Sequence, residues 1–137
     1  MSENTTNYLR RYRLFSKQSK GSYEMAVAVA KYYGVGCFHD GSTIWLVHSD
    51  NSLVKECKRT IKRLRNECRS QATSHSMFSG LCQGVAAHYH SVTLTGLSDD
   101  ILDYLARRQN RVTQSRASQY NPVEFCAGLQ AALSLVA

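Results

Sequence analysis

Apolar and basic residues share one helical spacing between residues 53 and 69. The apolar positions recur every three or four residues, which places side chains on one face of an α-helix. These positions are Val54, Cys57, Ile61, Leu64 and Cys68. The basic positions have the same spacing shifted by one residue, and they are Lys55, Lys58, Lys62, Arg65 and Arg69. The segment predicts a helix, capped by Asp50 or Ser52, with an apolar stripe beside a line of five cations, here called the basic ridge.

Two further segments predict helices in the first two thirds of the chain. Residues 22–34 predict a short, largely buried helix, with Ser22 as N-cap and Gly34 in the left-handed conformation that ends it. In the segment MFSGLCQGVAAHY, one face carries Phe78, Leu81, Cys82, Val85 and Tyr89. Gly80 and Gly84 lower the helix propensity of this segment, so we expect a neighbouring element to pack closely against them.

The stretch between the predicted helix at residues 22–34 and the one at residues 53–69 has the pattern of a β-hairpin. β-branched and aromatic residues lie on both sides of Asp40-Gly41, which is a strong short-range hairpin signal. We expect a hairpin over residues 35–48, with strands near 35–39 and 43–48.

The region after residue 97 predicts a helix and then a loop. Ser98 provides an N-cap, and Asp99 and Asp100 place negative charge in the first turn, where the helix dipole favours it. We expect this helix to end near Val112 with basic residues in its last turn, namely Arg107, Arg108 and Arg111. The polar residues 113–120 then predict a flexible loop.

A last helix is expected from residue 122 onward. Asn121 is placed as its N-cap, Pro122 as its first residue and Glu124 as the third residue of a capping box. Its expected apolar face consists of Cys126, Leu129, Leu133 and Val136.

Together these elements predict an α+β fold in a single domain over residues 1–137. A small antiparallel sheet is built from the hairpin 35–48, with residues 91–97 (SVTLTGL) as a candidate third strand, and four or five helices cover it. Residues 1–20 form a basic N-terminal arm. Its segment YLRRYRLFSKQSKG mixes aromatic and basic residues without a decisive period, so strand, helix and partner-ordered arm all stay open.

Composition adds a strong positive charge to this picture. The chain has 17 Lys and Arg against 10 Asp and Glu, a formal net charge of +7. Such an excess attracts polyanions or acidic protein surfaces. No apolar run approaches the length of a membrane span, and the polar opening MSENTTNYLRRYR does not resemble a secretory signal. We therefore expect an intracellular protein without a membrane partner.

The five cysteines predict reduced thiols rather than a disulfide framework, because their number is odd and no export signal precedes them. Four of them fall on the apolar phase of expected helices, where cysteine behaves as a small hydrophobic residue. These expected core residues are Cys57, Cys68, Cys82 and Cys126.

The basic ridge admits three explanations. It can be a solvated helix face, since Lys and Arg are good helix formers and favour solubility. It can face an acidic patch elsewhere in the fold, although the chain has only ten carboxylates. It can also meet an external polyanion, because a ridge about 20 Å long would reach several phosphates of a nucleic acid. Only Glu56 and Glu67 lie within the segment, and neither projects onto the ridge.

The N-terminal arm offers a second set of cations near aromatic rings. Arg10, Arg11 and Arg13 are suited to phosphate binding, and Tyr8 and Tyr12 can stack on exposed bases. The alternative is an ordinary edge strand whose charges discourage aggregation.

Other chemistry finds little support in the residue spacing. Cys37 and His39 alternate, as do His88 and His90, but neither pair has the spacing of a structural zinc site, so no metal is expected. We find no nucleophile with a base, no acid–base carboxylate pair and no phosphate-binding glycine motif. The prediction is therefore a non-enzymatic protein without a cofactor.

The order of elements over residues 22–90 resembles a bacterial and phage domain of uncharacterised function. The resemblance is carried by KYYGVGCF, the hairpin, the charged helix and MFSGLCQGVAAHY. That family has a Phe-x-x-Gly motif, whereas only Ser79 separates Phe78 from Gly80 here. The resemblance implies an architecture and a mobile-element origin, and it implies no functional residue.

The sequence thus predicts a basic protein that contacts nucleic acid or a nucleoprotein complex. The binding residues would be those of the basic ridge, supplemented by Arg10, Arg11 and Arg13. The alternative is a small phage-type inhibitor or adaptor, of an anti-defence or host-takeover kind, that docks on an acidic protein surface. In that case the apolar stripe can pair within the chain or in a homodimer.

Overall fold

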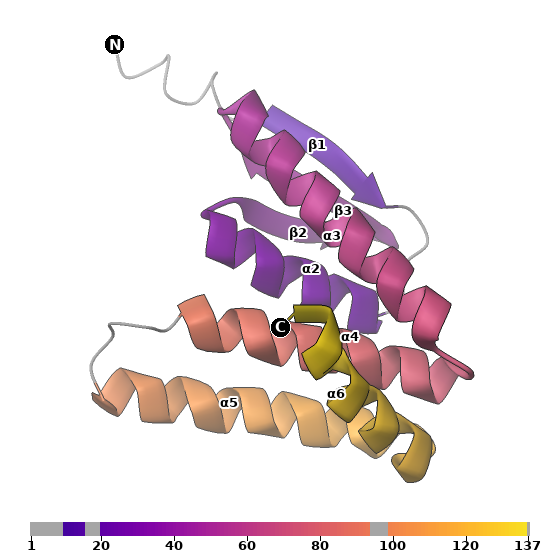
Figure 1. The fold of residues 1–137 in the computed structure, drawn as a ribbon. Helices are drawn as coiled ribbons and strands as arrows, with labels where there is room; N and C mark the ends of the chain where they lie inside the picture. Colours follow the sequence, from indigo (N-terminus) through magenta and orange to yellow (C-terminus); the bar gives the residue numbers. More distant parts are fainter. Residues whose placement is uncertain (1–9, 16–19, 94–98, 137) are drawn as a thin grey trace.

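A computed structural model describes residues 10–15, 20–93 and 99–136, and Figure 1 shows their arrangement. It has the predicted α+β fold, in which a three-stranded antiparallel sheet is accompanied by helices. The elements in chain order are β1 (Arg10–Phe15), α2 (Lys20–Tyr33), β2 (Gly36–Asp40), β3 (Thr43–His48), α3 (Asn51–Gln71), α4 (His75–Thr93), α5 (Asp99–Ala117) and α6 (Pro122–Val136). In these described segments, no helix has both the length and the apolar character needed to cross a membrane.

The sheet has the order β1-β3-β2, so the expected hairpin forms two of its strands. Gly41 has φ +62° in the turn, a conformation that glycine adopts without strain. The third strand is β1, from the N-terminal arm, which pairs with the free edge of β3. The prediction of a strand at 91–97 is wrong for residues 91–93, which continue α4, and the remainder lies outside the described residues.

One face of the sheet packs on helices and contributes to the core. Ile44 and Leu46 on β3 are buried on this face, and α2 and α3 pack against the sheet (Figure 1). The entire apolar stripe of α3 is buried inside the chain, as predicted, at no more than 2% exposure. The stripe is therefore occupied by intramolecular packing. Asp50 is the N-cap, since its carboxylate accepts hydrogen bonds from the backbone N–H groups of Ser52 and Leu53.

Close packing against the glycines of α4 is confirmed, and the partner is α6. A Cβ atom on Gly80 would collide with the carbonyl oxygen of Phe125, and one on Gly84 would lie 3.0 Å from the carbonyl oxygen of Leu129. The absence of side chains at these positions lets the two helix backbones approach. The residues of α6 buried at this contact are Phe125, Gly128 and Ala132.

This contact also explains why the predicted apolar face of α6 is wrong for Cys126 and Leu133, whereas Val136 packs against the core as predicted. Helices that approach closely bury their smallest residues, so Gly128 and Ala132 turn inward, while Leu133 is 66% exposed. Cys126 is exposed for the same reason and is not a core residue, in contrast to Cys57, Cys68 and Cys82. The cap of α6 is as predicted, because Asn121 accepts a hydrogen bond from the N–H of Glu124 at 3.1 Å.

Two other local predictions are wrong. Ser22 is not an N-cap, because α2 begins at Lys20 and Ser22 is buried within it. Residues 113–117 are not a loop, because α5 continues to Ala117. In this extra turn Arg116 forms an ion pair with Glu24 of α2, a tertiary contact that favours continued helix. The three arginines expected at the end of α5 therefore lie in its middle.

Candidate functional site

The basic ridge is helical, as predicted, and it lies on the exposed flank of α3. The buried apolar stripe fixes the rotation of α3 about its axis, so the ridge must emerge beside it. Lys55, Lys62 and Arg69 are exposed, whereas Lys58 and Arg65 are partly buried.

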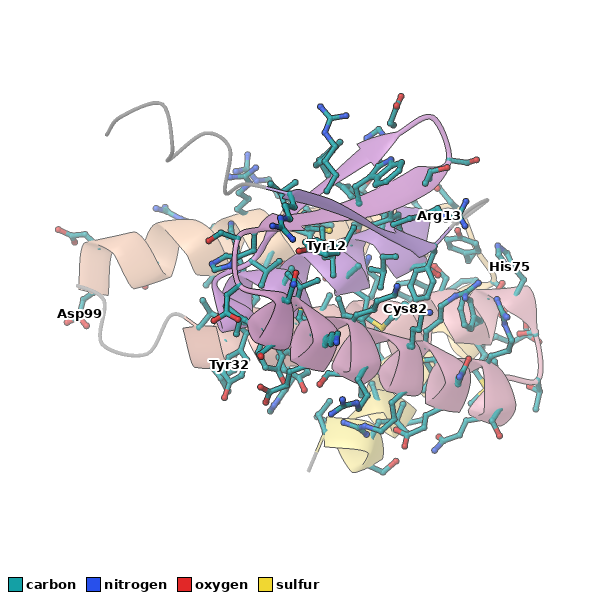
Figure 2. All side chains as sticks on the ribbon, turned by 90° about the horizontal axis from the view of Figure 1, so that it is seen from above. Tyr12, Arg13, Tyr32, His75, Cys82 and Asp99 are labelled. Atoms are coloured by element: carbon teal, nitrogen blue, oxygen red, sulfur yellow. The ribbon has the colours of Figure 1, made fainter. Side chains whose placement is uncertain are left out.

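β1 brings a further cation to the ridge. Arg13, labelled in Figure 2, lies on β1 next to α3. The hydroxyl of Tyr12 donates a hydrogen bond to Oδ1 of Asn51, which fastens β1 to the first residue of α3. The strand and the helix are thereby held together along a shared boundary.

A hollow of about 500 Å³ lies at this boundary, and we call it the basic groove. Its lining residues are Arg13, Leu14, Phe15, Lys58, Lys62, Arg65 and Asn66. Four of these seven side chains are cationic, and none is a carboxylate. The groove therefore concentrates positive charge that its own walls do not neutralise.

The titration of the groove cations reflects this crowding. The pKa of Lys58 is lowered by partial burial and by the charges of Lys62 and Arg13. The pKa of Arg65 is likewise lowered, by partial burial and by the charge of Arg69. Each lowered pKa means that the surroundings disfavour the charged form, and a bound anion would reverse this effect.

Arg65 has an unusual environment within the groove. Its guanidinium carbon lies 4.3 Å from the centre of the Phe15 ring, which is a cation–π contact. Its Nε is buried and has no hydrogen-bond partner in the protein. Arg65 is thus anchored on one side by an aromatic ring while its hydrogen-bonding capacity is incompletely used.

No described carboxylate neutralises the ridge or the groove. Among the described residues, ion pairs join Arg63 to Glu67 at 3.4 Å and Arg116 to Glu24. Neither pair includes a residue of the basic ridge. An acidic patch within the fold, one of the three explanations for the ridge, is therefore not found in the described part of the chain.

The structure separates the predicted binding residues into groups. Lys58, Lys62 and Arg65 line the groove together with Arg13, whereas Lys55 and Arg69 do not. The guanidinium carbon of Arg69 lies 5.8 Å from the ring centre of Phe78, on α4.

The other two arginines of the arm also lie outside the groove. Arg10 is exposed, and it lies opposite His48 in the register of β1 and β3. Arg11 lies over the Phe38 ring, with its guanidinium carbon 5.6 Å from the ring centre. Sequence reasoning missed the groove because it did not identify β1 as the strand that brings Arg13 and Phe15 to α3.

A second hollow, of about 410 Å³, is also rich in arginine but differs in charge. It lies between α2 and α5, and its lining residues are Glu24, Arg108, Arg111, Val112, Ser115 and Arg116. Glu24 pairs with Arg116 and accepts a further hydrogen bond from Gln83, so part of the charge is neutralised internally. The basic groove is the stronger candidate for an external anion.

Thiol and metal chemistry have little basis in the described residues. Burial is the main cause that raises the pKa of both Cys37 and Cys57 to about 12, so these thiols stay protonated at neutral pH. A hydrogen bond with Cys68 and burial raise the pKa of Cys82 as well. No group of three or more His, Cys, Asp or Glu side chains that could hold a metal is found in residues 10–15, 20–93 and 99–136.

Comparison with known proteins adds no further assignment. No protein-family model, curated protein or solved structure matches the chain. The resemblance of residues 22–90 to a bacterial and phage domain therefore stays a prediction.

Proposed function

We propose that this chain is a non-enzymatic protein that binds the phosphate backbone of nucleic acid, free or within a nucleoprotein complex, in its basic groove. The observation that carries the proposal is the convergence of four cations from two elements around one hollow whose walls contain no carboxylate. Lysine supplies a mobile point charge to phosphate oxygens, and arginine supplies a planar set of donors.

The energetics favour a polyanion over a solvated face. Lys58 and Arg65 are partly buried in positions that lower their pKa values. Partial burial of like charges costs free energy in the free protein. Binding of phosphates would offset this cost and release counterions from the nucleic acid.

The test is the salt dependence of binding to fluorescently labelled oligonucleotides, measured by anisotropy. If all four groove cations contact phosphate, log K should fall with log salt with a slope of about −3 to −4. Lys62→Gln removes one exposed groove cation and should make the slope shallower by about 0.7–0.9. Arg59→Gln is the matched control, because Arg59 is an exposed cation of α3 that does not line the groove.

The outcomes separate this proposal from the acidic-partner alternative. Equal effects of Lys62→Gln and Arg59→Gln would show that only net charge matters and that the groove is not the site. If no oligonucleotide binds at low salt, the proposal fails, and an inhibitor or adaptor that docks on an acidic protein surface becomes the better explanation.

A further inference from the structure

The sheet has a second face that no described helix covers. Along β3, Ile44 and Leu46 are buried against the helices, whereas Trp45 and Val47 alternate with them and are partly exposed. Successive side chains of a strand point to opposite faces, so Trp45 and Val47 lie on the outer face. Figure 2, viewed from above, shows the strands with no helix drawn over them.

The strand register gathers aromatic and basic side chains on this outer face. Trp45 lies directly between Arg13 of β1 and Phe38 of β2, and Val47 lies between Arg11 and Gly36. Directly opposed residues point to the same face. We call this set the sheet platform: Arg11, Arg13, Phe38, Trp45 and Val47.

A cation–π contact supports this placement. The guanidinium carbon of Arg11 lies 5.6 Å from the centre of the Phe38 ring, although the two residues belong to opposite edge strands. They can meet only across the same face of β3. Gly36 has no side chain, so the platform is open beside Val47. The carboxylate on this face, Asp40, pairs with Thr43 next to the turn, beyond the Trp45 row.

The sheet platform and the basic groove are joined by Arg13. This residue lines the groove with Lys58 and Lys62, and it also pairs with Trp45 across the sheet. A ligand that follows the groove therefore passes directly onto partly exposed aromatic rings. The two surfaces together have the features of a site for an anionic chain with planar groups attached.

The combination of a cationic groove with partly exposed aromatic rings favours a single strand over a duplex. In a duplex the bases are stacked on each other and paired, so their faces cannot reach aromatic rings on a sheet. In a single strand they are free to stack on such rings, while phosphates follow a line of cations. Cross-strand packing explains why Trp45 and Phe38 are neighbours, but it does not account for their continuity with four unneutralised cations.

We propose that the ligand of this protein is single-stranded nucleic acid, with bases stacked on Trp45 and Phe38 and phosphates in the basic groove. This inference rests on the proposed function and adds the form of nucleic acid and the residues that hold its bases. DNA and RNA strands share the required chemistry.

The protein contains its own reporter, because Trp45 is its single tryptophan. Trp45 fluorescence is measured during titration with oligothymidylate, with oligouridylate and with a DNA duplex, each about 12 units long, within the range of single-domain site sizes. Both single strands are expected to quench the fluorescence and to bind more tightly than the duplex. Their relative affinities distinguish DNA from RNA as the preferred strand.

A pair of variants then tests stacking directly. Phe38→Leu keeps an apolar residue on the sheet and removes one ring, so the affinity for the single strand should fall by about 5-fold or more. The salt slope should not change, because no phosphate contact is lost. Tyr32→Leu is the matched control, since Tyr32 is an exposed ring on α2 that belongs neither to the groove nor to the platform.

The results that would overturn this inference differ from those that would overturn the proposed function. Salt-dependent binding with equal affinity for strand and duplex, unchanged Trp45 fluorescence and no effect of Phe38→Leu would exclude the stacked single strand and leave the phosphate-binding groove intact. Absence of binding to every oligonucleotide at low salt would overturn both.

Discussion

Replacement of Arg65 by methionine should weaken nucleic-acid binding without weakening the fold. Arg65 contacts the Phe15 ring at 4.3 Å through its guanidinium carbon, yet its buried Nε has no partner in the protein. Burial and the charge of Arg69 both lower its pKa, so the fold disfavours the charge that a phosphate would need. Methionine preserves helix propensity and can keep a favourable contact with the ring.

The expected change in stability follows from three contributions. Loss of the cation–π contact costs about 0.5–1 kcal/mol. A sulfur–aromatic contact returns about 0.3–1.5 kcal/mol, and removal of an unpaired buried donor returns about 1–3 kcal/mol. The free energy of unfolding of Arg65→Met should therefore be higher, by between about 0.3 and 4 kcal/mol. Arg65→Met should bind more weakly than the unmodified chain because it loses one phosphate contact. The ratio of the two affinities should be about five- to eightfold larger at about 0.1 M salt than at about 1 M salt.

Urea unfolding followed by Trp45 fluorescence gives the stability, and anisotropy with a labelled oligonucleotide gives the affinity. Arg59→Met is the control, because it removes an exposed cation of the same helix outside the groove. If Arg65→Met lost more than about 1 kcal/mol of stability and kept full affinity, Arg65 would be a structural residue. The reasoning that assigns the groove to phosphate would then be refuted.

Two further predictions concern the fold. Gly80→Ala should lower the free energy of unfolding by about 2 kcal/mol or more, because the added methyl would collide with the backbone of Phe125 and force α4 and α6 apart. A urea midpoint equal to that of the unmodified chain would contradict the close packing. Stability should fall as pH rises from about 9 towards 12, because the thiols of Cys37 and Cys57 ionise near 9 when unfolded but have pKa values raised to about 12 when folded. Urea midpoints across this pH range measure the loss of stability, which should be smaller in Cys37→Ala. An identical loss in that variant would exclude the Cys37 thiol as a cause.

Local patterns in the sequence were sufficient for elements whose signals act over a few residues. The buried stripe of α3, the turn at Gly41 and a cap at one of two candidate residues follow from helical spacing, the conformational freedom of glycine and side-chain capping. The structure shows that the cap is Asp50 rather than Ser52. The close approach to Gly80 and Gly84 was also predicted, because two glycines within a helix need a compensating contact. Its partner was not, since many segments can supply a small-residue face.

Predictions failed where a tertiary contact competes with local preference. β1 occupies the edge of β3, while residues 91–93 stay in α4, where the hydroxyl of Thr93 donates to the carbonyl oxygen of Tyr89. The ion pair between Arg116 and Glu24 joins residues 92 positions apart, so no pattern near Arg116 indicates that α5 continues.

For the candidate site, too, one part follows from the sequence and another part only from the tertiary structure. The sequence alone determined that five cations line one flank of a helix, because a helical period follows directly from residue spacing. Only the tertiary structure decided which of them line one groove. It pairs β1 with β3, which places Arg13 and Phe15 against α3 and Trp45 between two edge strands. Strand pairing joins residues that are distant in the chain, and its register depends on the packed core as a whole rather than on any one segment.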